Sequence, residues 1–144
     1  MNRRRHAVDL SSLLILALLA GCGSRETATD SGAPRMRPAE QGASSAVYLT
    51  LRNPSPDTLV LRGVEIDVAG AATLHESMDH DGMASMMHRD SVVVLPNDSV
   101  AFRERGLHIM ATDLHTPIVA GDTVVVRLMF ASARVDTIRV PVRE

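Results

Sequence analysis

Histidine and methionine are concentrated in one quarter of this 144-residue chain. The stretch from residue 75 to residue 110 holds four of the six His and five of the eight Met. The thioether of Met is a soft, neutral ligand that suits Cu(I) and matches Zn(II), Mg(II) and Ca(II) poorly, whereas imidazole binds copper in either oxidation state. This composition predicts a copper(I) site. The candidate ligands are His75, Met78, His80, Met83, Met86, Met87, His88, His108 and Met110.

Two pairs within this set have spacings that could bring their side chains together. On a strand, residues i and i+2 point to the same face, so His108 and Met110 would converge while Ile109 turns into the core. His75 and Met86 flank a turn signal at residues 79–82, and a hairpin there would bring them together. The full pattern is His-x10-Met-x21-His-x-Met.

This spacing resembles the signature of the periplasmic copper chaperone family known as PCuAC, also called DUF461. The resemblance extends from about residue 46 to residue 142, with matching segments such as Leu74-His75-Glu76 and Gly106-Leu107-His108-Ile109-Met110. It implies a cupredoxin-like β-sandwich that holds one Cu(I) near the surface through two His and two Met. It also implies delivery of copper to respiratory copper sites, chiefly cytochrome c oxidase. The four residues that match the ligand pattern are His75, Met86, His108 and Met110.

The chain departs from the family pattern at two places. Family members often carry Met two residues after the first His, where this chain has Ser77, so Met78 is a candidate substitute. The usual Pro-Gly-Gly before the second His is Glu104-Arg105-Gly106 here, which alters the local loop.

The remaining His and Met residues have two interpretations. They could form a second, weaker Cu(II) site through His80, His88 and Asp81, or they could be solvated loop residues, with Met83 or Met87 filling the core. The second interpretation is favoured, because no spacing supports the first. Glu76 could orient His75 as a hydrogen-bond acceptor, or it could be a surface charge.

The N-terminus predicts export and lipid attachment. Three Arg precede a short apolar run, and Leu19-Ala20-Gly21-Cys22 resembles the bacterial lipobox, in which the Cys is lipidated. We therefore predict a signal peptide over residues 1–21, a flexible lipidated tether over 22–44 in which Met36 is incidental, and a copper-binding domain over 45–144. The residue after Cys22 is Gly rather than Asp, which favours the outer membrane over the inner membrane on the periplasmic side.

From residue 45 onward the pattern is that of an all-β protein. Eight or nine short strands separated by regular turns predict a cupredoxin-like, immunoglobulin-like β-sandwich or barrel. A strand over 58–68 is expected to break at Ala69-Gly70, and a short strand is expected over 72–76. No helical period of twelve residues or more follows the signal.

Charge and residue content narrow the function classes. Removing residues 1–21 takes away three Arg and one Asp, so the net charge changes from −2 to −4, which argues against nucleic-acid binding. Cys22 is the only Cys, so a blue-copper site with its thiolate is excluded from the domain. We expect a monomeric, non-enzymatic copper carrier whose partner is a respiratory copper protein or its assembly factor. The alternatives are a Cu(II)- or Zn-buffering lipoprotein and a structural immunoglobulin-like lipoprotein without a transfer role.

Overall fold

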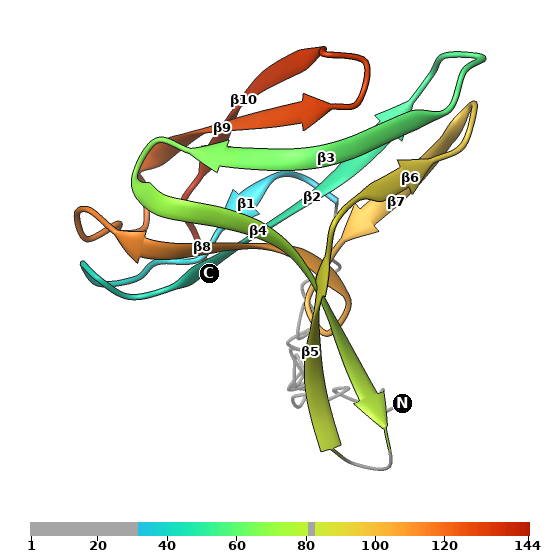
Figure 1. Cartoon of the computed structure of the whole chain (residues 1–144). Helices are drawn as coiled ribbons and strands as arrows, with labels where there is room; N and C mark the ends of the chain where they lie inside the picture. Colours follow the sequence, from blue (N-terminus) through green and yellow to red (C-terminus); the bar gives the residue numbers. More distant parts are fainter. Residues whose placement is uncertain (1–31, 81–82) are drawn as a thin grey trace, which may run out of the picture.

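This computed structural model describes residues 32–80 and 83–144. This part of the chain forms ten strands joined by turns and loops. They are β1 (Arg35–Met36), β2 (Ser45–Asn53), β3 (Leu59–Ile66), β4 (Ala69–His80), β5 (Met83–Arg89), β6 (Val92–Val94), β7 (Asp98–Phe102), β8 (Leu107–Leu114), β9 (Thr123–Phe130) and β10 (Val135–Pro141). The larger sheet has the order β1-β2-β8-β4-β5, with β7 also pairing with β2, and the smaller sheet has the order β10-β9-β3-β6 (Figure 1). The predicted all-β sandwich is confirmed.

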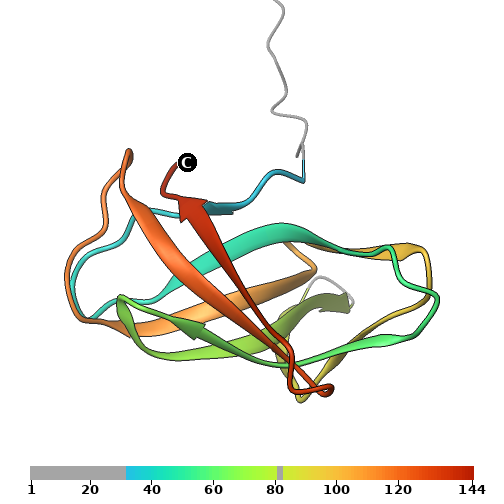
Figure 2. The ribbon, with the colours of Figure 1, turned by 90° about the horizontal axis from the view of Figure 1, so that it is seen from above.

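Apolar alternation explains why the two sheets pack together. Along β9 the residues Val124, Val126, Leu128 and Phe130 are buried, while the residues between them are more exposed. Figure 2 shows strands β9 and β10 (dark orange and red) crossing over the strands of the larger sheet. With so few aromatic residues in the chain, the core between the sheets is mostly aliphatic. Its fully buried side chains include Leu61, Ile109, Leu114, Val47, Val94, Val126 and Val140.

The N-terminal boundary of the fold differs from the prediction. Strand β1 lies inside the predicted tether, its Met36 is 0% exposed, and the Arg37 N–H donates to the Ala46 carbonyl at 3.2 Å. The expectation of a flexible segment through residue 44, with an incidental Met36, is therefore wrong for residues 35–44. The physical reason is that this segment extends the sheet at β2 and places a large apolar side chain in the core. The predicted signal peptide, Cys22 and the start of the tether lie outside the described residues.

Strand β4 is longer than predicted. It runs without a break from Ala69 to His80, where a break at residues 69–70 was expected. Gly70 marks a close approach instead, since a Cβ there would lie 2.7 Å from the Asp113 carboxylate on the neighbouring strand. The first part of β4 pairs with β8, whereas its last four residues pair only with β5. The β4–β5 hairpin consequently projects from the body of the sandwich (Figure 1).

Candidate metal centre

Strand β8 presents His108 and Met110 on one face of the larger sheet. Ile109 between them is 0% exposed and belongs to the core, so its two neighbours point away from the core. This is the arrangement that the His-x-Met spacing predicts. His108 is nevertheless buried, at 5% exposure, and Met110 is half-buried. The imidazole is therefore held among its neighbours and is not free in solvent.

His75 is the centre of the site, because strands pair with β4 on both sides of it. In the β4–β8 ladder it lies directly opposite His108, and in the β4–β5 ladder it lies directly opposite His88. Directly opposed residues share a face of the sheet. The His75 ring centroid is 6.0 Å from that of His108 and 5.6 Å from that of His88. The three imidazoles thus form a row across three neighbouring strands.

The two thioether candidates lie on the same face, one on each side of this row. Met110 is paired with Thr73 and Met86 with Ser77, which places each Met diagonally from His75 by two residues. Long side chains reach such diagonal neighbours. Met86 is 53% exposed and stands on the edge strand β5. The structure therefore brings all four predicted ligands to one face, with Met86 nearest the solvent.

A turn before β8 sets the tautomer of the neutral His108 imidazole. The His108 Nδ1 lies 2.9 Å from the Gly106 carbonyl oxygen, which can only accept a hydrogen bond, so Nδ1 carries the proton. That leaves the lone pair on Nε2 available for a metal. The same carbonyl accepts the Ser77 N–H at 3.0 Å, which ties the turn to β4. Arg105 in this turn has a φ of 56°, which lies in the left-handed region. It stands where the Pro-Gly-Gly sequence of the PCuAC pattern has a Gly, and Gly adopts this conformation without strain.

His75 also has a nitrogen available for a metal. Its Nδ1 is buried and makes no hydrogen bond with any residue that the structure describes. Burial of the ring holds the pKa of His75 below its ordinary value, and the neighbouring His108 and His88 lower the pKa further. The neutral imidazole is the ligand form. A buried nitrogen without a partner, beside thioethers and a second imidazole, fits a soft metal ion.

Glu76 does not orient His75. It lies on the opposite face of β4, next to Leu74 and Met78 in the alternation, and accepts a hydrogen bond from the Arg89 Nε at 2.8 Å. The suggested acceptor role is therefore wrong, and Glu76 is instead a charge that pairs with Arg89.

The other His and Met residues divide between the two faces of the hairpin. Met78, Met83 and Met87 lie on the face opposite His75 and are exposed, so the expectation that Met83 or Met87 fills the core is wrong. Met78 is likewise not brought to the four ligands. His80 pairs with Met83 at the end of β4, but its side chain and Asp81 lie outside the described residues. His88 lies directly opposite His75, a position that its spacing in the sequence did not indicate.

The sequence feature that could have placed His88 opposite His75 is the Asp81-Gly82 dipeptide. An Asp-Gly pair between two strands is typical of a two-residue hairpin loop, and that loop length alone pairs residue 80 with 83 and residue 75 with 88. The broader turn over residues 79–82 did not define this register. Among residues 32–80 and 83–144, no three His, Cys, Asp or Glu side chains already stand together as metal ligands.

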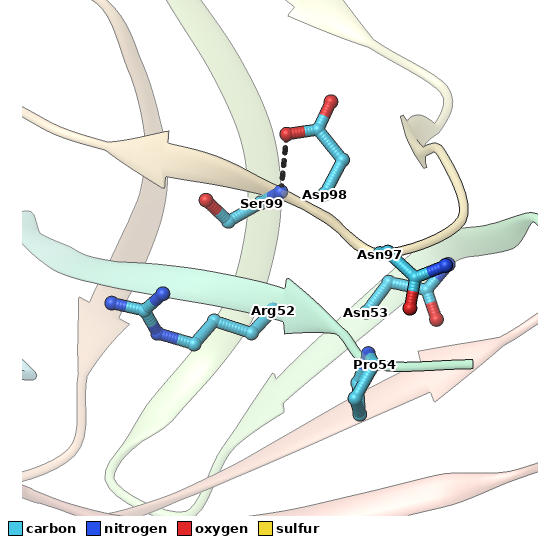
Figure 3. Close-up of a pocket in the computed structure, with 6 residues that line it drawn as sticks. All are labelled: Arg52, Asn53, Pro54, Asn97, Asp98 and Ser99. Carbon is cyan, nitrogen blue, oxygen red and sulfur yellow. Dashed lines mark hydrogen bonds between the residues drawn. The ribbon is translucent and has the colours of Figure 1, made fainter. Parts of the chain in front are cut away.

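One hollow, lined in part by Leu74, His88, Arg89 and Asp90, borders the row of imidazoles, and other hollows lie away from it. Figure 3 shows one between the ends of β2 and β7, where Asp98 Oδ1 accepts the Ser99 N–H at 2.7 Å. It is lined by Arg52, Asn53, Pro54, Asn97, Asp98 and Ser99. Another groove borders Met110 and is lined by Arg37, Pro38, Ser44, Ser45, Ala46 and Tyr48. The candidate centre therefore lies on a face of the sheet, with one hollow bordering it at His88 and another bordering it at Met110.

Solved structures of several proteins share this fold. The copper-bound PCuAC domain from PmoF2 is 21% identical, with a TM-score of 0.63, and the match covers 76% of this chain and 87% of that domain. The apo PCuAC domain from PmoF1 is 17% identical with the same TM-score, over 76% and 88%. The Cu(I) form of DR1885 from Deinococcus radiodurans is 22% identical, with a TM-score of 0.59, over 75% and 76%. The resemblance to PCuAC domains is confirmed in the fold.

A relative and a family model connect the chain to lipoproteins. It is 27% identical over 101 residues to "Putative lipoprotein Lxx21020" of Leifsonia xyli subsp. xyli (strain CTCB07), a match that covers 69% of this chain and spans 61% of that protein's length. No helix within residues 32–80 and 83–144 is long and apolar enough to cross a membrane. Residues 29–142 match the family model described as "Putative lipoprotein LpqE-like". The chain belongs to this LpqE-like lipoprotein family.

Proposed function

We propose that this chain is an exported, lipid-anchored metallochaperone that binds one Cu(I) through His75, Met86, His108 and Met110. The observation that carries the proposal is the placement of these four residues on one face of the β8–β4–β5 sheet. Two neutral imidazoles and two thioethers make a soft donor set without a thiolate. Outside the cytoplasm such a set holds Cu(I) without forming disulfides.

The position of the site also suits transfer to another protein. Every residue of β5 is exposed, and this strand forms the edge of the larger sheet. Met86 on β5 is the most exposed of the four proposed ligands, whereas His108 is buried. An acceptor would therefore displace Met86 first and take the ion while the two imidazoles still hold it. We propose that the acceptor is a respiratory copper site, such as that of cytochrome c oxidase, or its assembly factor.

The relatives lend further support. Two of the proteins that share the fold were solved with copper, the PCuAC domain from PmoF2 in a copper-bound form and DR1885 in its Cu(I) form. The family and the Leifsonia relative are described as lipoproteins, which agrees with the lipobox-like run ending at Cys22. We accordingly propose attachment through Cys22 to a membrane on the periplasmic side. We favour the outer membrane, because the residue after Cys22 is Gly rather than Asp.

Competition for Cu(I) tests the binding site. The purified chain is titrated against a chromophoric Cu(I) chelator, and the titration is repeated with Met86→Leu and Met110→Leu. Each variant is expected to lose affinity by about tenfold or more, which corresponds to about 1.4 kcal/mol. Met83→Leu is the matched control, because this exposed Met lies on the same hairpin but on its other face.

Undiminished Cu(I) affinity in both ligand variants would rule out the thioether site. Tight Zn(II) binding with negligible Cu(I) binding would instead favour the metal-buffering alternative.

A transfer assay tests the chaperone role separately. The Cu(I)-loaded chain is mixed with the copper-free form of a soluble oxidase copper domain, and the two proteins are separated and analysed for copper. We expect copper to move from the chain to the oxidase domain faster than the chain releases copper to the Cu(I) chelator in solution. Transfer that is no faster than release of copper from the chain into solution would contradict the delivery role.

A further inference from the structure

We propose that His88 joins His75 and His108 as the third imidazole ligand of Cu(II), in a site that overlaps the proposed Cu(I) site. The inference rests on the proposed function, because the two sites share His75 and His108. The chain would then hold copper in both oxidation states at one place, with thioethers completing the Cu(I) site and His88 completing the Cu(II) site.

The register of the sheet is the first argument. His88 and His108 are the direct cross-strand partners of His75 on its two sides. The side chains of such partners start about 4.5–5.5 Å apart at Cβ and share a face. The ring centroids lie 5.6 Å and 6.0 Å from that of His75, within the separation of rings whose nitrogens bind one ion above the middle strand.

The hydrogen bonds of the three rings leave nitrogens available. His108 uses Nδ1 to donate to the Gly106 carbonyl, and the His75 Nδ1 has no partner among the described residues. The closest ionic neighbour of His88 is Asp90, with 3.4 Å between Nε2 and Oδ1, which is longer than an ordinary hydrogen bond. Both of these side chains are exposed, that of His88 at 56%, so rotation of the imidazole toward His75 breaks little.

That rotation is required, since the three rings do not yet stand as a set of metal ligands. Cu(II) prefers nitrogen donors to thioethers, and three imidazoles with a water molecule make a suitable tetragonal set. Met86 and His88 are two residues apart on β5 and face the same way. Each can therefore reach the ion from the same edge strand, and the oxidation state selects which of the two binds.

Pulsed EPR of the Cu(II)-loaded full chain, which counts coordinated imidazoles, tests the inference. We expect three in the wild type and two in His88→Ala, with the affinity of the variant for Cu(II) in competition with nitrilotriacetate about tenfold lower. Cu(I) affinity should stay within about threefold of wild type, which also shows that the variant is folded. His88→Asn is a second, more conservative variant, and His115→Ala is the control, an exposed His away from the row.

An unchanged imidazole count and Cu(II) affinity in both His88 variants would overturn the inference. A loss in His80→Ala that is absent in His88→Ala would also overturn it, because Cu(II) would then bind at the hairpin tip. Failure of the proposed function has a different signature, namely Cu(I) affinity that is insensitive to Met86→Leu and Met110→Leu.

Discussion

The Nδ1 of His108 lies 2.9 Å from the carbonyl oxygen of Gly106, two residues earlier in the chain. This contact predicts that neutral His108 carries its proton on Nδ1 and presents the Nε2 lone pair to a metal. Long-range ¹H–¹⁵N correlation spectra of the metal-free protein should show His108 in the Nδ1–H tautomer, with His115 as an exposed reference. Addition of Cu(I) should move the Nε2 resonance of His108 most. A dominant Nε2–H form in the metal-free protein would contradict the geometry.

The lowered pKa of His75 predicts how the stability of the metal-free protein depends on pH. Because burial and the neighbouring His108 and His88 hold this pKa below its ordinary value of about 6.5, the unfolded chain binds a proton more readily than the folded chain does. Neutral His75 therefore contributes to the free energy of unfolding in a pH-dependent way. This contribution is complete above the pKa of His75 in the unfolded chain, and it is lost as the pH falls through that value toward the lower pKa in the folded chain.

Urea unfolding between pH 8 and pH 5.5 measures this contribution. The free energy of unfolding of the wild type should fall with pH, and the fall should be smaller in His75→Gln, which has no charge to bury. His115→Gln is the control and should keep the full fall. Equal pH dependence in the wild type and in His75→Gln would show that His75 does not contribute.

Met36 predicts that the segment before residue 45 is part of the folded domain. Its side chain is fully buried in the core, so Met36→Ala should lower the free energy of unfolding by about 2–5 kcal/mol. Val93→Ala is the control, since Val93 is half exposed and should change stability by about 0.5 kcal/mol or less. Chemical unfolding gives both values. A tether without structure would give no change for Met36→Ala.

Cys22 predicts lipid attachment. Expression with a radiolabelled fatty acid in a bacterial host should label the wild-type chain and bring it down with membranes, since a lipidated N-terminal Cys is the anchor. Cys22→Ala should lose the label and leave the membrane fraction. Because Cys22 is the only Cys in the chain, its replacement removes no disulfide. Labelling of Cys22→Ala, or its retention in washed membranes, would contradict the assignment.

The sequence was sufficient for the fold class and for the local half of the site. Alternation within each strand and the turns between strands predicted an all-β sandwich, and the ten strands of the structure confirm it. The pair His108 and Met110 followed from the two-residue period of a strand, with Ile109 as its buried partner. These properties depend on residues that are close together in the chain, and so they can be predicted from short windows.

The tertiary structure decided how segments that are distant in sequence pair with one another. The register of β4 with β8 and β5 places His75 at the centre of a row. It also places His88 directly opposite His75, a position that the expected turn over residues 79–82 did not specify, and it leaves Met78, Met83 and Met87 on the other face. Packing against β2 and the core drew Met36 out of the presumed tether. A shift of one residue in such a ladder moves every side chain to the opposite face. The sequence by itself therefore determined which residues are candidate copper ligands, whereas the hydrogen-bonded register of three strands decided which of them face one another.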